Sequence, residues 1–228
     1  MAKGKLYGIG VGPGDPELLT LKALRLLKEC PVIGIPGKNP SESVAFNIAK
    51  GAYPEIERKQ LLLLETPMTK DRDILDEGYE KAADQIIECL DQGKDVVVVT
   101  LGDTTVYSTY IYMQRNVAAK GYEVETVPGI TSFCAVSAYL NDSLVDRDEM
   151  LHVIPASYQI DDALELSGTK VLMKAASKMP EVKKVIKEKN QKAIMMENCG
   201  MENQMVYTSV DDIPDSASYY SLTIIKER

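Results

Sequence analysis

The sequence has few of the residues on which metal sites, disulfide frameworks and catalytic triads depend. Its 228 residues contain one histidine and four cysteines. The cysteines lie far apart and form no paired spacing, which predicts neither a zinc site nor a set of disulfides. The single histidine, His152, lies in an expected strand, where a core role is more common than that of a catalytic base. No protein-bound metal and no catalytic triad are therefore expected.

Long apolar runs and basic clusters are also missing. No run approaches the roughly 18 consecutive apolar residues that cross a bilayer. The first apolar run, residues 6–11, is broken by two glycines and does not look like a signal peptide. We therefore expect a cytoplasmic protein without a membrane partner. The formal net charge of -8 and the lack of a Lys/Arg cluster disfavour nucleic acid, whereas a few cations in a cleft could still hold a small anion.

Apolar strands alternate with amphipathic helices through the first half of the chain. The valine-rich segment 95–101 has the pattern of a strand covered on both faces, and the alternation predicts a mainly parallel sheet. The first helix is expected to place Leu18, Leu21, Leu24 and Leu27 on one face. Strands are expected at residues 5–11, 31–35, 60–64, 95–101 and 122–127, and helices near 18–27, 41–50, 74–90 and 106–119.

The second half is expected to form a separate α/β domain. Lys120 and Gly121 break the helical pattern, which predicts domains at residues 1–120 and 121–228. The last two expected strands have no helix between them, which favours antiparallel pairing and therefore a mixed second sheet. A helix is expected to begin near Ile130, and strands are expected at residues 151–154, 170–173, 193–196, 205–209 and 219–226.

A glycine-rich turn, residues 8–16 (GIGVGPGDP), follows the first strand. Neither glycine register completes the dinucleotide-binding fingerprint, because Pro13 or Asp15 stands in the place of the last glycine. The turn suits phosphate poorly, since Pro13 has no N–H and Asp15 is negative. It suits a ligand that is neutral at its adenosine end and cationic at its centre, such as S-adenosylmethionine. The alternative is an ordinary α/β turn in which Asp15 caps the helix.

Two further polar segments follow strands. After segment 95–101, Gly102 would let a ligand approach the backbone, and Asp103 could accept hydrogen bonds from a ligand's ammonium or hydroxyl groups. Alternatively, Asp103 caps the next helix. After the following strand, a Pro-Gly turn leads to Thr131, Ser132 and a run of small residues against which a flat ligand could lie. The alternative is that both are simple helix-start residues.

Together, the three segments resemble the ordered motif set of the tetrapyrrole methylase family: Gly-x-Gly-Pro-Gly-Asp near the N-terminus, Gly-Asp after a central strand, and Pro-Gly-Ile-Thr-Ser later in the chain. The resemblance covers nearly the whole chain. It implies two α/β domains that flank a trough, with S-adenosylmethionine in the cleft between them and a tetrapyrrole entering from the open side. It also implies a homodimer.

The resemblance assigns roles to individual residues through these motifs. Asp103, in the loop that faces the methionine part of the cofactor, is also the candidate catalytic group. Met173 is expected near the adenosine, with a core methionine as the alternative, and Gly200 belongs to a later ligand-contacting loop. The residues expected to contact S-adenosylmethionine are Pro13, Gly102, Asp103, Val106, Thr131, Ser132, Met173 and Gly200.

Within the family, residues 107–109 (YST) resemble the same segment of the members that methylate C-20 of precorrin-2 or cobalt-factor II in cobalamin biosynthesis. Relatives that act on uroporphyrinogen tend to show Phe-Gly-Arg there. Thr104 departs from the family pattern, because many members have proline after Gly-Asp, and this leaves the shape of the loop open. Cations on or near loops are candidates for holding the substrate's carboxylates: Lys38, Arg72, Arg115, Arg147 and Lys174.

Methyl transfer from a sulfonium needs an in-line nucleophile about 3 Å away, so positioning can supply much of the rate enhancement. The nucleophile would be the meso carbon of the substrate, and little acid–base machinery is needed. Four alternatives stay open: methylation at another ring position, methylation of a modified histidine on a translation factor, a nucleotide-dependent oxidoreductase, and a non-catalytic tetrapyrrole carrier. The broken dinucleotide fingerprint argues against the oxidoreductase, and a carrier would not need the three motifs.

Overall fold

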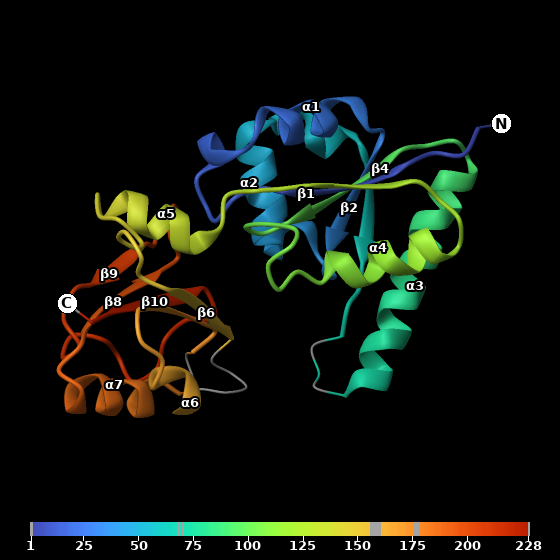
Figure 1. Cartoon of the computed structure of the whole chain (residues 1–228). Helices are drawn as coiled ribbons and strands as arrows, with labels where there is room; N and C mark the ends of the chain where they lie inside the picture. Colours follow the sequence, from blue (N-terminus) through green and yellow to red (C-terminus); the bar gives the residue numbers. More distant parts are fainter. Residues whose placement is uncertain (1, 68, 70, 156–160, 176–177, 228) are drawn as a thin grey trace. The chain divides into compact units, whose positions relative to one another are not determined.

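The computed structural model describes residues 2–67, 69, 71–155, 161–175 and 178–227. The chain divides after Thr131 into two compact units, each with its own sheet (Figure 1). Among the described residues, no helix is long and apolar enough to span a membrane.

The first unit is built on a five-stranded sheet in which every pairing is parallel, as predicted. Because helices cover both of its faces, its strands are apolar on both sides, and the four valines of the central strand are all buried. The strand order is β3-β2-β4-β1-β5. The strands are β1 (Leu6–Gly10), β2 (Val32–Pro36), β3 (Gln60–Leu64), β4 (Val96–Thr100) and β5 (Val124–Val127).

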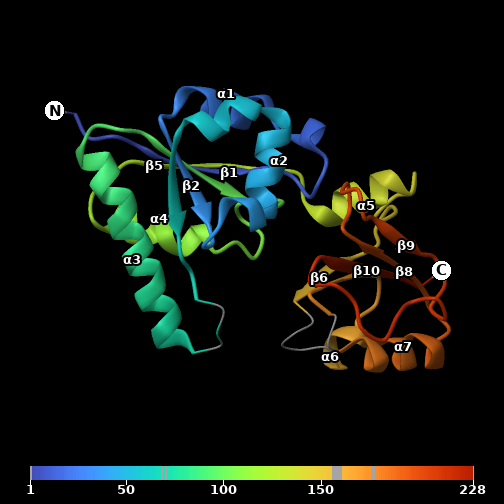
Figure 2. The same cartoon turned by 180° about the vertical axis from the view of Figure 1, so that it is seen from behind.

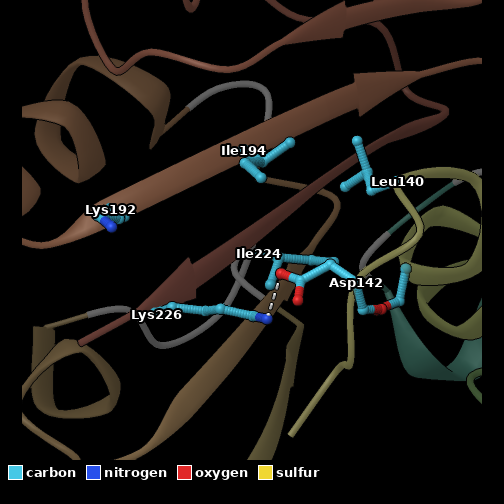
Figure 3. A pocket seen from close by; sticks show the side chains of 7 residues that line it. Leu140, Asp142, Lys192, Ile194, Ile224 and Lys226 are labelled. Atoms are coloured by element: carbon cyan, nitrogen blue, oxygen red, sulfur yellow. Dashed lines mark hydrogen bonds and ion pairs between the residues drawn. The ribbon is translucent and has the colours of Figure 1, made fainter. Parts of the chain in front are cut away.

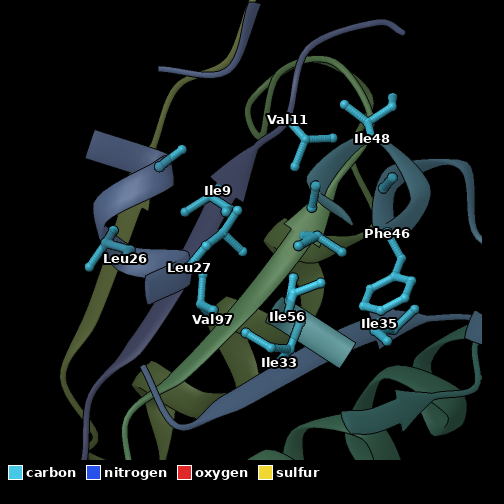
Figure 4. Packing of buried hydrophobic residues seen from close by; sticks show 14 of the residues in the cluster. Ile9, Val11, Leu26, Leu27, Ile33, Ile35, Phe46, Ile48, Ile56 and Val97 are labelled. Carbon is cyan, nitrogen blue, oxygen red and sulfur yellow. The ribbon is translucent and has the colours of Figure 1, made fainter. Parts of the chain in front are cut away.

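Two pairs of helices cover the two faces of this sheet (Figure 2). On one face, α1 (Leu21–Glu29) and α2 (Val44–Ala52) pack on alternate residues of the strands, and Figure 4 shows Leu26 and Phe46 among this cluster. On the other face lie α3 (Arg72–Asp91) and α4 (Tyr110–Ala119). Short 3₁₀ turns complete the unit: η1 (Pro16–Leu18), η2 (Pro40–Glu42) and η3 (Pro54–Arg58).

Side-chain caps set the starts of three helices. The side chains of Thr20, Ser43 and Asp71 accept hydrogen bonds from backbone N–H groups in the first turns of α1, α2 and α3. The predicted apolar face of the first helix was partly wrong, because Leu21 is 86% exposed. The η1 turn delays the start of α1 to Leu21, and its buried face consists of Ala23, Leu26 and Leu27.

The second unit contains a mixed five-stranded sheet with the order β6-β7-β10-β8-β9. The mixed character is confirmed, but the reason given for it was wrong, since the last two strands of the chain do not pair with each other. Strand β10 inserts antiparallel between β7 and β8, and β9 pairs with β8. The strands are β6 (Leu151–Pro155), β7 (Thr169–Met173), β8 (Lys192–Glu197), β9 (Met205–Tyr207) and β10 (Ser221–Lys226).

Helices cover both faces of the second sheet. Helix α5 (Ser132–Tyr139) contributes Val136 to the apolar cluster on one face, while α6 (Asp161–Leu164) and α7 (Met179–Glu188) pack on the other. The predicted boundary near Gly121 lies before β5, whereas the division of the structure lies after it. The difference arises because β5 pairs with β1 and is therefore part of the first sheet.

Candidate functional site

The strand order of the first sheet creates a switch point between β1 and β4. The chain leaves β1 toward α1 on one face of the sheet and leaves β4 toward α4 on the opposite face. The two strands are parallel neighbours, so both of these loops start at the same end of the sheet. Open α/β sheets bind ligands beside the carboxyl ends of strands at such a switch point.

The three segments singled out in the sequence meet at this end of the first sheet. The loops after β1 and β4 are joined by two hydrogen bonds, from Gly12 N to Gly102 O at 3.2 Å and from Gly102 N to Gly12 O at 2.8 Å. The turn after β5 also lies against them, because a Cβ on Gly129 would stand 2.2 Å from Gly102 O and 2.7 Å from the Cα of Gly10. Main chain therefore contacts main chain at this point, without side chains between.

The glycines of the first turn have different physical roles. A Cβ on Gly8 would stand 2.1 Å from the ring of Tyr110, so Gly8 makes room for a buried aromatic side chain. Gly10 allows the backbone contact with Gly129, and Gly12 adopts a positive φ of 79°. The sequence contained no signal for the contact between Gly8 and Tyr110, because the two residues lie in different elements.

Asp103 and Thr104 tie the loop after β4 to the segment at the end of β5. Asp103 is 7% exposed, and its Oδ2 accepts a hydrogen bond from Gly129 N at 2.8 Å. Its Oδ1 accepts from Thr105 N at 2.7 Å and from the Thr105 hydroxyl. The fully buried Thr104 donates from Oγ1 to Val127 O at 3.0 Å, a bond that a proline at this position could not make.

The structure shows whether Asp15 and Asp103 cap helices, which was the alternative interpretation of each residue. Asp15 does act as a cap, but of the short η1 turn, where its Oδ1 accepts from Glu17 N at 2.8 Å. Asp103 does not cap α4, which starts at Tyr110 with Thr109 as its N-cap residue. The buried carboxylate of Asp103 therefore holds the loop after β4 against the turn after β5.

The other expected contacts of the first unit lie in the same three segments. Pro13 is buried in the turn after β1, and Val106 is half-buried in the loop after β4. Thr131 follows the Pro-Gly turn. The buried hydroxyls of Thr100, at the end of β4, and of Thr131 have no hydrogen-bond partner in the structure. Unpaired buried hydroxyls of this kind call for a partner outside the chain, such as a bound water or ligand.

The expected contacts of the second unit lie in α5, at the end of β7 and in the loop after β8. Ser132 begins α5, and Met173 ends β7, where it packs against the apolar cluster beneath α5. Gly200, in the loop after β8, has a φ of 77° and donates its N–H to the Gln204 side chain at 2.7 Å. The core alternative for Met173 therefore agrees with its packing, although the side chain is only half-buried.

Lys174 directly follows β7 and has an unusual backbone conformation. Its φ is 59°, in the left-handed region that side chains other than glycine and asparagine seldom adopt, and its Nζ lies 5.4 Å from the centre of the Tyr219 ring. Asn198, after β8, has a φ of 53°. Strained residues gather at functional sites more often than elsewhere, which makes this end of the second sheet a candidate for binding.

Charged side chains concentrate at the opposite, amino end of the first sheet. Lys22 and Lys5 contact the two carboxylate oxygens of Glu125 at 2.6 Å and 2.8 Å. Hydrogen bonds from Lys22 and Lys5 lower the pKa of Glu125 to about 2. Lys5 N also donates to Asp95 Oδ1 at 2.7 Å. These charges tie β1, β4, β5 and α1 together away from the three loops.

Cys30 and His152 lie outside the three loop segments. Burial raises the pKa of the Cys30 thiol to about 12, which makes it unreactive. His152 is half-buried in β6, with Nε2 2.9 Å from Ser167 O, and this position agrees with a structural role. Among the described residues, no group of three or more His, Cys, Asp and Glu side chains could hold a metal ion.

A pocket of about 150 Å³ lies within the second unit, between the end of α5 and strands β8 and β10 (Figure 3). It contains an ion pair between Asp142 and Lys226 at 2.7 Å. None of the residues expected to contact S-adenosylmethionine lines it. Its lining consists of Ser137, Leu140, Asp142, Lys192, Ile194, Ile224 and Lys226.

The comparisons with known proteins agree with this architecture and show the family. Residues 5–214 match the family described as Tetrapyrrole (Corrin/Porphyrin) Methylases, and the chain belongs to this family of methyltransferases. It is 34% identical over 227 residues to a protein of Methanocaldococcus jannaschii named probable cobalt-precorrin-2 C(20)-methyltransferase, covering 97% of this chain and 96% of the relative.

A second relative and a solved structure extend the comparison. A Sinorhizobium protein named precorrin-2 C(20)-methyltransferase is 27% identical over 233 residues, covering 97% of this chain and 95% of the relative. The crystal structure of uroporphyrin-III C-methyl transferase from Thermus thermophilus, complexed with S-adenyl homocysteine, has a TM-score of 0.73 at 20% identity. The match covers 98% of this chain and 92% of that chain, so the two proteins share a fold.

Proposed function

We propose that this protein transfers a methyl group from S-adenosylmethionine to C-20 of precorrin-2 or of its cobalt-containing counterpart, cobalt-factor II, in cobalamin biosynthesis. The observation that carries the proposal is the 34% identity, over nearly the full length of both chains, to the Methanocaldococcus protein named for that reaction. The meeting of the three motif loops at the switch point supports it.

The first unit would hold the adenosine and methionine parts of the donor. The loops after β1 and β4 present backbone at Pro13 and Gly102, and Val106 and Thr131 flank them. In the second unit, Ser132, Met173 and Gly200 stay proposed contacts. When bound, S-adenosylmethionine supplies an electrophilic methyl group. The work of this chain is then to orient the donor and substrate and to exclude water, which can account for much of a rate enhancement.

The proposed substrate carries many carboxylates, and the five cations named above stay proposed as its contacts. Three of them belong to the first unit, where Lys38 also lies 3.6 Å from Glu65 and Arg115 lies against the Tyr112 ring. The other two, Arg147 and Lys174, belong to the second unit, and both have a positive φ. Charge reversal at all five should abolish tetrapyrrole binding, and unchanged binding would remove them from the proposal.

The test is methyl transfer from labelled S-adenosylmethionine to precorrin-2 and to cobalt-factor II, prepared in parallel without oxygen. NMR would then locate the new methyl group, and uroporphyrinogen III would serve as a control substrate. We expect label at C-20 of one of the first two compounds. Binding of S-adenosylhomocysteine without transfer to either would move the substrate elsewhere in the family, and transfer to uroporphyrinogen III would contradict the proposed position.

The oligomeric state and the cellular location of the protein stay predictions. The family resemblance implies a homodimer, which sedimentation or light scattering of the purified protein would test directly. A cytoplasmic location was predicted from the sequence, and fractionation of the source cells would test it. Neither is needed for the proposed reaction.

A further inference from the structure

We infer that Asp103 is a positioning residue, which clamps the Pro-Gly turn after β5 to the loop after β4, and that it is not the proton acceptor of the reaction. The inference rests on the proposed function. It revises the role suggested by sequence alone, in which Asp103 was both a ligand contact and the candidate catalytic group.

The hydrogen bonds of the carboxylate are the first argument. A carboxylate offers about four acceptor positions, and Asp103 uses three of them for Thr105 N, the Thr105 hydroxyl and Gly129 N. All three partners are donors from the protein itself. With 7% of its surface exposed, the residue has little capacity left for a substrate proton.

The strand order supplies the second argument. Strands β4 and β5 are not neighbours, because β1 lies between them. The bond from Gly129 N to Asp103 therefore reaches across the carboxyl end of β1. The next residue, Thr104, makes a parallel connection to Val127 O at 3.0 Å. Two consecutive side chains of one loop thus bind the end of β5 and the turn that follows it.

The glycine contacts explain why such a clamp is useful. The backbones of Gly10, Gly102 and Gly129 lie so close that a single Cβ on Gly10 or Gly129 would overlap the others. Glycine has the largest conformational freedom of any residue, so a turn that contains it needs other groups to hold it in one position. The charged acceptor of Asp103 provides a strong hydrogen bond for this purpose.

The test compares three variants of the full-length protein. Asp103→Asn keeps one acceptor oxygen but turns an NH₂ donor toward the N–H of Gly129 or Thr105. Thr104→Val removes the neighbouring connection and keeps the carboxylate. Asp95→Asn is the matched control, because Asp95 also accepts from a backbone N–H, that of Lys5 at 2.7 Å, but at the amino end of β4.

Three measurements separate a clamp from a base: amide hydrogen exchange at Gly129 by NMR without ligand, the Kd of S-adenosylhomocysteine by calorimetry, and the pH profile of kcat. In Asp103→Asn we expect exchange at Gly129 to quicken and the Kd to rise, each by about tenfold or more, because a hydrogen bond to a charged group is lost. The shape of the pH profile should not change. Thr104→Val should shift the same quantities less, and Asp95→Asn should leave the Kd unchanged.

The opposite pattern would overturn the inference. A base would leave Gly129 exchange and the Kd unchanged in Asp103→Asn, while kcat fell and one limb of its pH profile disappeared. If Asp103→Asn does not fold, Thr104→Val decides, since unchanged exchange and Kd in that variant would also refute the clamp. Failure of the wild-type protein to bind S-adenosylhomocysteine would refute the proposed function, whereas the exchange at Gly129 would still test the clamp.

Discussion

The two ends of the strands in the first sheet are held together in different ways. At the carboxyl end, glycine backbones touch each other, and two buried side chains, Asp103 and Thr104, fix the loops. At the amino end, partly exposed charges such as Glu125 and Lys5 connect the same strands. Close backbone contact is not confined to the carboxyl end, because a Cβ on Gly4, before β1, would stand 2.1 Å from Lys94 O. What distinguishes the two ends is the buried side chains that fix the loops at one and the partly exposed ion pairs at the other.

In the second sheet, positive φ values occur at both ends of the strands, at Lys174, Asn198 and Gly200 after β7 and β8 and at Gly168 and Asn190 before them. Its buried charge, however, lies at the amino end. At the amino end of β7, Lys170 is completely buried, and its Nζ donates to Gly168 O at 3.1 Å and lies 3.8 Å from a carboxylate oxygen of Glu227. Changes at carboxyl ends should therefore affect binding, and changes at amino ends should affect stability.

The largest effect is expected for Gly129→Ala. The new Cβ would stand 2.2 Å from Gly102 O, against backbone that has little room to move. Unfolding should become easier by about 1–3 kcal/mol, as for other overpacked sites. Affinity for S-adenosylhomocysteine should fall by at least about tenfold, measured by calorimetry.

The control for this change is Gly121→Ala. Unlike Gly129, Gly121 has a positive φ, of 83°, but no atom lies within 4 Å of the place of its Cβ. It should therefore cost about 1 kcal/mol through backbone strain alone and leave ligand affinity unchanged. Equal losses of affinity in the two variants would refute the special role of the carboxyl end.

The next largest effect is expected for Lys170→Met. Burial lowers the pKa of Lys170, so its charge opposes folding at neutral pH and does so less as pH rises toward the ordinary value of 10.5. Replacement by an apolar side chain of similar size should raise the free energy of unfolding by about 1 kcal/mol at pH 7. Chemical denaturation at pH 7 and pH 10 would measure the gain, which should shrink at the higher pH.

An exposed lysine provides the comparison for that variant. Lys184 is largely exposed on α7, 3.9 Å from Glu188, and Lys184→Met should change stability by less than about 0.5 kcal/mol. A loss of stability in Lys170→Met would mean that the partners at Gly168 and Glu227 more than offset the cost of burial.

A smaller effect is expected for Glu125→Gln at the amino end of the first sheet. Because the pKa of Glu125 is lowered to about 2 by Lys22 and Lys5, its contribution is complete above the ordinary value of 4.5 and is lost as pH falls toward 2. The variant should lose about 0.5 kcal/mol of stability at pH 7, a modest value because the pairs are partly exposed. The difference from wild type should vanish near pH 2.

Denaturation as a function of pH would measure this effect, with Glu77→Gln as control. Glu77 pairs with Lys81 on the exposed surface of α3, and its loss should cost less than that of Glu125. Affinity for S-adenosylhomocysteine should be unchanged in both variants. A loss of affinity in Glu125→Gln would contradict the expectation that the amino end of the first sheet affects stability but not ligand binding.

The smallest change in stability is expected for Lys174→Gly. Release of the left-handed strain should be offset by the greater freedom of glycine in the unfolded chain and by the lost contact with Tyr219, within about 1 kcal/mol. If Lys174 holds a substrate carboxylate, KM for the tetrapyrrole should rise. Asn190→Gly, with a φ of 53° in the turn before β8, is the control and should leave KM unchanged.

Local elements were predictable because their causes are local. Strand 60–64 was predicted with its observed bounds, and Ser43 was one of the two expected caps of α2. The exposure of Leu21 was not predicted, because one helical periodicity was assumed from Leu18 onward. Leu18 lies in the η1 turn, where the periodicity of an α-helix does not apply. The residues that hold the loops were harder to find. Thr104 stood out as a departure from the family's proline, and nothing in the sequence pointed to Thr105.

The sequence by itself determined the alternation of strands and helices, the mainly parallel and mixed sheets, and the order of three motifs that mark the family. These properties depend on spacing and residue type along short stretches of chain. The tertiary structure alone decided that β5 joins the first sheet, that β10 inserts between β7 and β8, and that Asp103 meets Gly129. Those contacts depend on which strands become neighbours, and strand order is set by packing between residues far apart in the chain.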